Sequence, residues 1–447
     1  MIFSSLEFLL FFAVYFAAAI LLPKRIYFIL LVAASLVFYG WWRAEYVLIP
    51  VVISAGVYLA CHVLGKTGFS RRNATISVII LLLPLAFFKY TNFIFGSEVI
   101  TYALPIGISF ITFSGIAYVI DYYRGDYRKI EPFSVILGYI VFFPQLVAGP
   151  ILRPGELITQ IKKPFRFSYK YLCLGALIFS VGIFKKIFIA DQIAVWVNEF
   201  YAGDVAVNLP NMLIAVYGFS VQIYCDFSGY TDMATGVALA LGVRLPLNFE
   251  RPYLSKSIAE FWRRWHMTLS RWFRDYVYIP LGGRAGSKLT LLRNVLITFG
   301  LSGLWHGAGF NFVAWGLITG LLIWLHRVFP LGQLLRLPSA LRVFLTFNLV
   351  TVLWILFRDR DLYLFKALSD MPFSDLLVFD QSLTSMIFPV VLIAITMVLH
   401  PWDSRVYYIR LHRKIGKAYS LFFALLIILA TTIFSTGSSA EFIYFDF

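Results

Sequence analysis

Long apolar runs, separated by short polar connections, repeat along almost the whole chain. A membrane-spanning helix needs about 20 apolar residues to cross roughly 30 Å of hydrocarbon. Runs of roughly that length lie at 6–22, 26–42, 46–64, 74–95, 102–120, 133–149, 171–190, 210–225, 295–325, 341–357, 384–400 and 419–434. The pattern predicts about 11 or 12 transmembrane helices. The run at 295–325 predicts either one tilted span or two elements separated by a break.

Composition supports this prediction and excludes other classes of protein. Of the 447 residues, 60% are hydrophobic and 14% are charged, and the mean hydropathy is +0.81. An average soluble domain carries roughly 25% charged residues, which excludes soluble enzymes, coiled coils and disordered tails. The alternating strands of a transmembrane barrel would dilute the hydropathy. The expected fold is all-α and polytopic, a single integral-membrane domain over residues 1–447 with its core at about 100–325.

The positions of the cations orient the predicted spans. The net charge is +15, and basic connections at 24–25, 66–72 and 124–129 alternate with connections that hold almost no cations. The positive-inside rule then places the N-terminus outside the cytoplasm. Residues 153–170 carry five Lys and Arg residues on the side that this counting makes external. We therefore expect a re-entrant hairpin or an in-plane helix just before them. Nucleic acid is not an expected partner, because no module that binds it fits between the spans.

The segment 244–293 differs in kind from the rest of the chain. It holds ten Lys and Arg residues against three acidic ones, a net charge of +7. Placed on one helix, residues 256–278 divide into two faces. The aromatic and aliphatic face holds Ile258, Trp262, Trp265, Leu269, Phe273 and Tyr276, and the polar face holds Glu260, Arg263, Arg264, Arg271, Arg274 and Asp275. This pattern predicts an amphipathic helix at the cytoplasmic interface, ended by Pro280 and Gly282. His266 falls at the border of the aromatic face, where it could also be incidental to a surface anchor.

A second histidine lies among glycines inside an apolar run. Residues 303–309 read GLWHGAG, which places His306 between Gly303 and Gly307. Glycine weakens a helix by about 1 kcal/mol relative to alanine, so a helix break or a close helix contact is expected here. An ionisable residue in a spanning segment is by default a functional candidate. A histidine that only bonds a neighbouring helix is the alternative.

Other polar residues in apolar runs give weaker indications. His62 and His400 sit at the ends of predicted spans, where interfacial histidines are common. Lys185 and Lys186 are expected to snorkel to an interface. Asp226 and Asp232 either support a polar cavity or pair with nearby cations. The three cysteines lie in apolar stretches without metal-ligand spacing, so no metal site is expected.

Several of these strings together resemble the membrane-bound O-acyltransferase family. The residues concerned are 251–253 (RPY), 261–276 (FWRRWHMTLSRWFRDY), 278–283 (YIPLGG) and the second histidine motif, 303–307 (GLWHG). The chain is more closely similar to the bacterial alginate O-acetylation branch of that family. That likeness rests on 3–5 (FSS), 143–151 (FPQLVAGPI), 226–232 (DFSGYTD) and the terminal 442–447 (FIYFDF), where Asp446 stands in place of an expected glutamine.

The resemblance implies both a fold and a task. The fold is a ring of tilted helices around a thinned centre, with a tunnel entered from both faces. The task is to move an acyl group from a cytoplasmic donor, acetyl-CoA, to an acceptor on the far side of the bacterial inner membrane. The resemblance makes His306 the catalytic histidine and His266 the second signature residue. It further implies a periplasmic acetyltransferase as partner and a polysaccharide as final acceptor.

Acyl transfer from a thioester needs a base and groups that stabilise the oxyanion. His306 is the expected base, and His266 would orient the donor or polarise its carbonyl. The candidate donor-binding or tunnel-lining residues are Trp262, Arg263, Arg264, Ser270, Arg271, Asp275 and Trp305. The arginines, with Arg274, would bind either donor phosphates or anionic lipid. Three alternatives remain open: D-alanyl transfer to teichoic acid, a transporter or flippase of an acylated carrier, and a structural subunit that recruits a soluble acyltransferase.

Overall fold

All regular secondary structure in the described residues is helical. The computed structural model describes residues 1–96, 99, 102–330, 332, 335–359, 361–370, 372–376, 383–434 and 443. The terminal string at 442–447 therefore lies outside the described residues, except for Ile443. The described chain divides into two compact units. The first contains Met1–Phe179, Tyr230–Pro246 and Ile415–Ala424, and the second contains Ser180–Gly229, Leu247–Lys414 and Leu425–Phe447.

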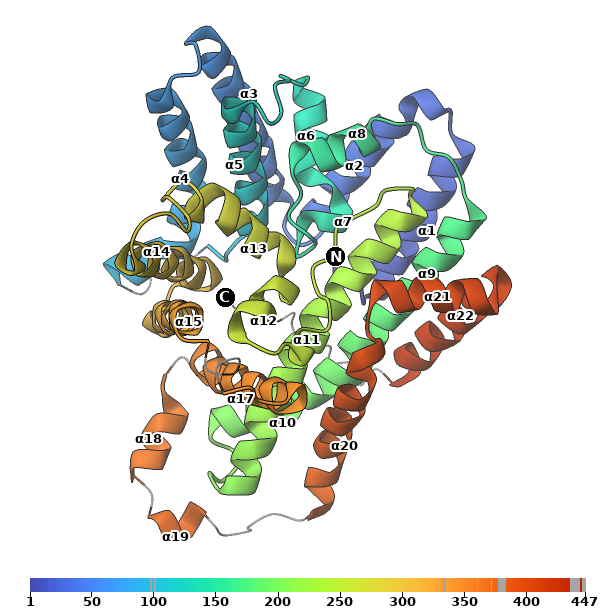
Figure 1. The fold of residues 1–447 in the computed structure, drawn as a ribbon. Helices are drawn as coiled ribbons and strands as arrows, with labels where there is room; N and C mark the ends of the chain where they lie inside the picture. The colour runs from blue at the N-terminus through green and yellow to red at the C-terminus, as the bar shows by residue number, and fades with distance from the viewer. Residues whose placement is uncertain are drawn as a thin grey trace. The chain divides into compact units, whose positions relative to one another are not determined.

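The first half of the chain forms short and long helices in succession (Figure 1). They are α1 (Leu6–Leu21), α2 (Tyr27–Gly40), α3 (Leu48–Lys66), α4 (Arg71–Phe95), α5 (Ile108–Arg124), α6 (Phe133–Val141), α7 (Phe143–Leu146), α8 (Pro154–Ile161), α9 (Tyr169–Ile183), α10 (Asp191–Ala202) and α11 (Leu209–Ala240). A π-helical segment, Phe184–Ala190, joins α9 to α10.

The second half begins with short elements and ends with longer helices. They are α12 (Ile258–Arg264), α13 (Met267–Phe273), α14 (Lys288–His306), α15 (Phe310–Val328), α17 (Ser339–Arg358), α18 (Tyr363–Asp370), α19 (Phe373–Leu376), α20 (Leu383–Leu399), α21 (Arg405–Ile415) and α22 (Lys417–Phe434). A second π-helical segment, Arg274–Tyr278, continues α13.

Several of these helices are long and apolar enough to cross a membrane. By length and composition the described residues contain five: Ala44–Lys66, Arg71–Phe95, Tyr169–Ala202, Phe310–Val328 and Ser339–Arg358. A sixth candidate is the pair Met386–Trp402 and Arg405–Ile415, bent by 78° at a short break. The protein is a multi-pass membrane protein. Other apolar runs form shorter or interrupted helices, so the number of crossings, the central tunnel and the single domain over 1–447 stay predictions.

In the first unit, two of the strings that carry the resemblance have clear structural roles. Ser5 caps α1, because its Oγ accepts a hydrogen bond from the Phe8 N–H at 3.3 Å. Phe3 is completely buried, and its ring lies 4.7 Å from both Phe8 and Tyr230. The string FSS thus starts the first helix and anchors it in the core. The buried aromatic ring just outside the cap fixes the angle at which the chain enters the helix.

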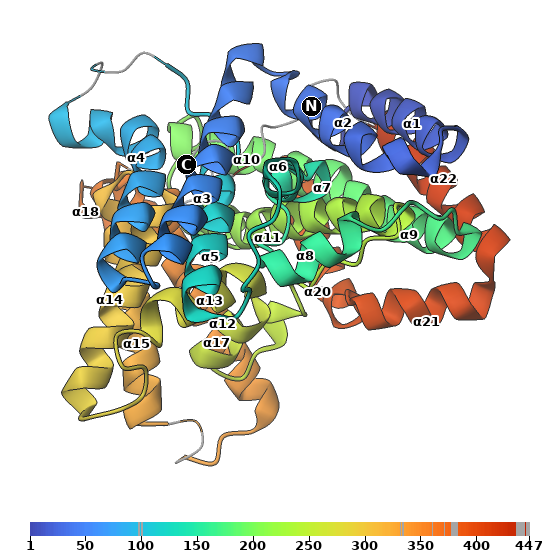
Figure 2. The same cartoon turned by 90° about the horizontal axis from the view of Figure 1, so that it is seen from above.

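The string FPQLVAGPI forms a buried irregular turn between α6 and α8 (Figure 2). The chain leaves α6 at Phe142, and the single-turn α7 follows with Pro144 near its start. The Gln145 side chain donates to the Tyr139 carbonyl at 2.8 Å, and the Tyr139 hydroxyl donates to the Leu152 carbonyl at 2.7 Å. Helix α6 therefore ends inside the run 133–149, and the re-entrant hairpin or in-plane helix expected there stays a prediction. Buried backbone leaves a helix only where side chains bond its polar groups, as they do here.

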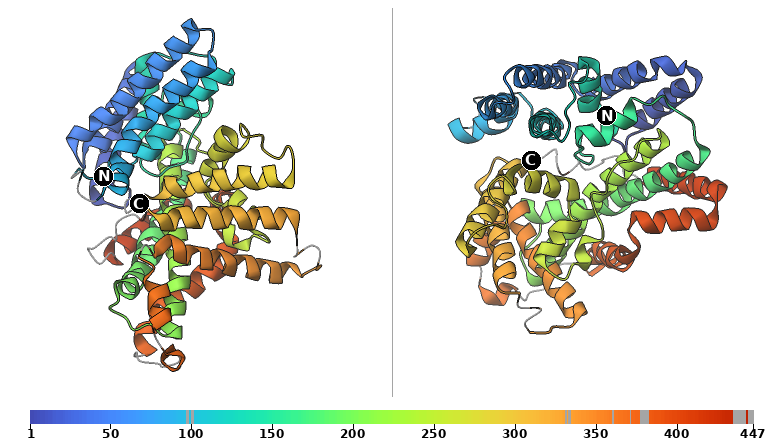
Figure 3. Two further views of the ribbon diagram at one scale, coloured as in Figure 1. Left: turned by 90° about the vertical axis from the view of Figure 1, so that its left-hand side faces the viewer. Right: turned by 45° about the horizontal axis from the view of Figure 1, so that its top comes forward.

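In the second unit, α14, α15 and α17 lie side by side (Figure 3, left). Residues 295–325 are two elements rather than one tilted span, because Gly307–Gly309 separates α14 from α15. The glycines also allow close contact between the two helices. A Cβ atom on Gly303 would lie 2.1 Å from the Phe312 carbonyl oxygen, and one on Gly316 would lie 2.2 Å from that of Phe299. Both features expected from the glycine pattern, the break and the close contact, are present.

Two lysines near α9 are buried rather than interfacial, which corrects the expectation that they snorkel. Lys185 and Lys186 are 6% and 3% exposed. Lys185 Nζ lies 3.1 Å from Asp403, while Lys186 Nζ lies 2.7 Å from Asp191 and 2.8 Å from Asp226. Removing an unpaired ammonium from water costs several kcal/mol, so these carboxylates are what allow burial. For Asp226, pairing with a cation is the alternative that the structure supports.

The close contact between α14 and α15 predicts the effect of adding one methyl group. Gly316→Ala places a Cβ against the Phe299 backbone, which cannot move without shifting α14. We expect a loss of roughly 1–3 kcal/mol of stability, measured as a lower midpoint of thermal unfolding of the purified protein in detergent. Gly300→Ala is the control, because its Cβ would meet only a Leu317 methyl group at 3.4 Å. Equal midpoints for the two variants would contradict the close packing.

Candidate active site

The segment that carries His266 is not the single amphipathic helix predicted over 256–278. Helix α12 ends at Arg264, Trp265 is extended, and His266 adopts the left-handed conformation with φ +40° and ψ 55°. Helix α13 then starts at Met267 and passes into the π-helical segment at Arg274. The prediction of one helix is therefore wrong. Left-handed backbone at a residue other than glycine costs roughly 1–3 kcal/mol and persists only where surrounding contacts impose it.

Asn248 supplies those contacts. The Met267 N–H donates to the Asn248 carbonyl at 2.9 Å, instead of to the preceding turn of a helix. The Oδ1 atom of Asn248 accepts from the Thr268 N–H at 3.2 Å and from the Thr268 hydroxyl at 2.9 Å. It also lies 3.1 Å from His266 Nδ1. The Glu250 N–H adds a further link, to the Arg264 carbonyl at 3.0 Å. These bonds use the Met267 and Thr268 N–H groups, which in a continuous helix would donate to the preceding turn.

The same oxygen fixes the tautomer of His266. A backbone N–H can only donate, so the Asn248 atom that faces Thr268 is the amide oxygen, which can only accept. The His266 Nδ1 atom must then carry the hydrogen, and Nε2 is the acceptor nitrogen of the ring. The side chain is 1% exposed, and burial lowers the pKa of His266 to about 3. The imidazole is therefore neutral at physiological pH.

His306 is the last residue of α14 and is 3% exposed. Its ring lies 5.0 Å from Trp305, 5.3 Å from Trp315 and 5.2 Å from Phe357, all nearly perpendicular. Gly307 is necessary at the next position, since a Cβ there would lie 2.1 Å from the Phe312 ring. The glycine-flanked break thus holds an imidazole inside an aromatic enclosure.

Trp305 connects the two histidines that the sequence singled out. Its ring centroid lies 5.9 Å from His266 and 5.0 Å from His306. Trp262 belongs to the same cluster, at 5.5 Å from Trp315. Phe227, in the string DFSGYTD, packs edge-on against His266 at 4.7 Å. The structure therefore brings both histidine motifs together around Trp305, although 40 residues separate His266 from His306.

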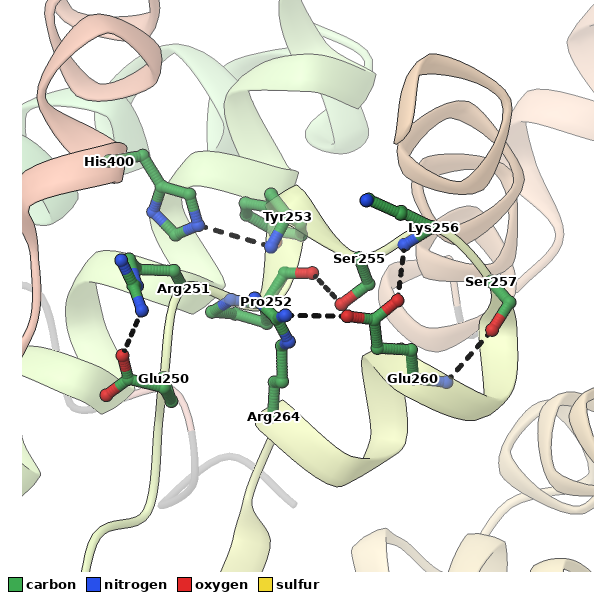
Figure 4. Close-up of polar contacts among 10 residues, drawn as sticks. All are labelled: Glu250, Arg251, Pro252, Tyr253, Ser255, Lys256, Ser257, Glu260, Arg264 and His400. Carbon is green, nitrogen blue, oxygen red and sulfur yellow. Dashed lines mark hydrogen bonds and ion pairs between the residues drawn. The ribbon is translucent and has the colours of Figure 1, made fainter. Parts of the chain in front are cut away.

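The charged candidates differ in exposure and in their partners. Arg263 and Arg274 are exposed, whereas Arg264 and Arg271 are half-buried, which corrects the expectation that all four share one exposed face. Arg264 bonds Glu260 at 2.6 Å, as Figure 4 shows, and Arg274 bonds the buried Asp275 at 2.7 Å and 3.2 Å. The Ser270 hydroxyl donates to the Trp265 carbonyl at 3.4 Å, so it supports the turn at His266.

Comparison with known proteins assigns the chain to a family. The model of the membrane-bound O-acyltransferase family matches residues 128–357, just over half of the chain and including both histidines and Asn248. The chain belongs to the membrane-bound O-acyltransferase family. It is thus an acyltransferase, and the resemblance found in the sequence is confirmed.

Three relatives show where in the family the similarity lies. A probable alginate O-acetylase, AlgI, of Pseudomonas aeruginosa is 38% identical over 81% of this chain and 73% of that protein. A peptidoglycan O-acetyltransferase of Helicobacter pylori is 34% identical over 74% of this chain and 70% of that protein. A teichoic acid D-alanyltransferase of Bacillus subtilis is 29% identical over 64% of this chain and 74% of that protein. The O-acetyltransferases match more of this acyltransferase, at higher identity.

The sequence did not indicate the structural role of His400, which lies outside the region matched to the family model. His400 follows α20 and is 2% exposed, so it is buried within the protein. Its Nε2 accepts from the Tyr253 N–H at 3.2 Å (Figure 4). Tyr253 follows Arg251, whose backbone is left-handed at φ +49°. A lone histidine at the end of an apolar run gives no local signal for such a contact, which spans 147 residues.

Replacing Asn248 tests its control of His266. Asn248→Ala removes one acceptor from three buried donors, which predicts a loss of about 1–3 kcal/mol of stability and of most acyl-transfer activity. Asn248→Asp keeps Oδ1 but places a carboxylate beside the imidazole, which raises the pKa of His266 above its value of about 3. Its activity should therefore fall at low pH, where the wild type remains active, because His266 is protonated there. Thermal midpoints and pH–rate profiles measure both effects.

Asn73→Ala, a half-buried asparagine near the start of α4, is the control for these variants. Unchanged stability and activity in Asn248→Ala would show that the turn at His266 is held by other contacts.

Proposed function

We propose that the protein transfers an acetyl group from cytoplasmic acetyl-CoA across the inner membrane, for O-acetylation of alginate or a similar exopolysaccharide. The proposal is supported by the relatives named as alginate O-acetylases and as a peptidoglycan O-acetyltransferase. It is supported further by the two buried histidines in contact with one tryptophan. The second observation carries the argument, because it identifies groups able to perform the chemistry.

His306 is the proposed general base. The acceptor hydroxyl oxygen attacks the thioester carbonyl carbon while the imidazole takes the hydroxyl proton. The C–S bond then breaks, and the proton passes from the imidazole to the departing sulfur. Trp305, Trp315 and Phe357 around the ring disfavour an uncompensated charge before the step. The imidazolium formed during the step is balanced by the negative charge that develops on the carbonyl oxygen.

His266 has a narrower proposed role than the sequence suggested. With hydrogen on Nδ1, bonded to Asn248, the ring can offer only a lone pair at Nε2. It therefore accepts a hydrogen bond, from an amide N–H of the donor or from the acceptor hydroxyl. This tautomer does not polarise the thioester carbonyl, which would require a donor. The arrangement of Asn248 thereby disfavours carbonyl polarisation by His266.

In this proposal the donor approaches along the segment 262–275, which contains His266. Arg263 is exposed and would attract the phosphates of acetyl-CoA together with Arg271, whereas Arg274 is already bonded to Asp275. Trp262 and Trp305 would line the path of the acyl group, while Arg264, Ser270 and Asp275 keep the segment in shape through the bonds given above. A periplasmic acetyltransferase would complete the transfer, with the N-terminus of this chain on the periplasmic side.

Replacing His306 tests the proposal directly. His306→Ala should lower the turnover of acetyl-CoA by roughly 100- to 10,000-fold, the usual contribution of a general base. The measurement is release of coenzyme A thiol by the purified protein reconstituted in liposomes. His62→Ala, a half-buried histidine on α3, is the matched control and should retain full turnover.

Full activity of His306→Ala would remove this residue from the mechanism. Absence of acetyl-CoA turnover in the wild type, with turnover of a D-alanyl carrier-protein thioester instead, would favour the teichoic acid reaction. Transport of an intact acylated carrier without thioester cleavage would favour the flippase alternative.

His266→Ala should be strongly impaired, and the kinetic constants separate its possible roles. Loss of a group that acts in the transition state lowers kcat and kcat/KM together, whereas loss of a positioning group mainly raises KM. We expect kcat to fall at least about 100-fold. A change confined to KM for acetyl-CoA would make His266 a residue that positions the donor.

A further inference from the structure

An open pocket of about 520 Å³ lies at the start of α9, within the first unit. Its walls come from the loop between α8 and α9, from the first turns of α9 and α2, and from the end of α11. Lys163 and Arg166 are its charged lining residues, and both are exposed. All of the lining residues are described, and none of them carries a carboxylate. The pocket is therefore cationic and suits an anionic ligand.

The wall formed by the end of α11 is held in place by side chains of α8 and α9. The Gln160 side chain bonds both backbone groups of Arg244, accepting from its N–H at 2.9 Å and donating to its carbonyl at 3.1 Å. The Arg244 guanidinium bonds the Tyr171 hydroxyl at 2.6 Å. Gly242, at φ +79°, makes the turn that directs the chain there. The pocket thus keeps its shape, and Arg244 adds a third cation at its rim.

Aromatic and apolar surface continues outward from the pocket. Tyr27 stacks on Phe165 at 5.5 Å, and Phe16 of α1 contacts Phe165 at 5.8 Å and Phe167 at 6.2 Å. Phe167 is nevertheless 51% exposed, and Leu21 at the end of α1 is 81% exposed. In a membrane protein, exposed apolar side chains beside cations suit the lipid–water interface, where the cations meet headgroups and the apolar groups meet acyl chains. A ligand here meets cations on one side and an apolar face on the other.

The preceding basic connection strengthens the local field. Lys24 and Arg25 are exposed and stand directly before Tyr27 in sequence. By contrast, Lys162 in the loop is bonded to Glu131 at 2.8 Å. The cations of residues 153–170 did not fit the positive-inside rule. Two of them, Lys163 and Arg166, line the pocket, and Lys162 forms an internal ion pair.

We propose that this pocket binds the phosphodiester headgroup of an anionic phospholipid. Lys163 and Arg166 would contact the phosphate, and the hydroxyls of Ser168 and Tyr171 would donate to headgroup oxygens. The acyl chains would follow the exposed apolar face of α1. A soluble phosphate ester shares the phosphate chemistry, but it would leave the surrounding apolar surface uncovered. The site is independent of acyl transfer, because it uses none of the residues assigned to that reaction.

The test compares lipids and variants by native mass spectrometry of the full-length protein in detergent. Phosphatidylglycerol should bind more tightly than phosphatidylcholine of the same chain length. In Lys163→Gln/Arg166→Gln its affinity should fall roughly 30-fold, about fivefold for each interfacial cation that is removed. Lys66→Gln/Arg71→Gln removes two exposed cations of the α3–α4 connection and should bind as the wild type does.

Two arms separate the possible sources of the phosphate. Glycerol 3-phosphate and coenzyme A, added in excess, should not displace phosphatidylglycerol. Displacement by either at micromolar concentration would overturn the lipid assignment in favour of a soluble phosphate ester. Equal retention of the two lipids, or an equal loss in both double variants, would show that binding is unspecific and overturn the proposal. Thermal midpoints confirm that all variants are folded.

Discussion

The amide oxygen of Asn248 accepts hydrogen bonds from three donors on the segment 266–268, and the geometry around His266 depends on it. Its own carbonyl takes the Met267 N–H, which removes that donor from any continuous helix. The local cost of left-handed backbone at His266 is offset only because these bonds act together. One asparagine thereby ends α12, starts α13 and selects the nitrogen that His266 presents. A residue placed 18 positions earlier decides the chemistry of the signature histidine.

In the second unit the buried lysines are paired with carboxylates, whereas aromatic rings pack around the two signature histidines. Lys186 is surrounded by Asp191 and Asp226, and Lys185 by Asp403, so these buried cations are compensated where they stand. Around His266 and His306 the packed rings are aromatic, and they include Phe227, Trp305 and Trp315. Burial among these rings lowers the pKa of His266 to about 3, because the imidazole loses the hydration that would stabilise its charged form.

Local sequence patterns predicted those features that are determined locally. The apolar runs predicted helices, and the glycines around His306 predicted both the break at Gly307–Gly309 and the close approach of α14 to α15. No glycine or proline marks the break at Trp265–His266, and the periodicity of 256–278 favours one helix, so the pattern failed there. Its cause, Asn248, acts through tertiary contacts that periodicity does not encode. The contact between His400 and Tyr253 was not predicted for the same reason, and it joins residues much farther apart in the sequence.

Whether a basic segment can bind an anion depends on the partners of its cations more than on their number. The segment 244–293 carries a net charge of +7, yet Arg264 and Arg274 are already bonded to Glu260 and Asp275. Exposed surface charges gain little from such pairs, but the pairs fix side-chain geometry and reduce what remains for a ligand. Lys163 and Arg166, from a shorter stretch with fewer cations in total, face a pocket lined without any carboxylate. Since the attraction of an anion depends on the local balance of charge, the stretch with fewer cations offers the more completely cationic site.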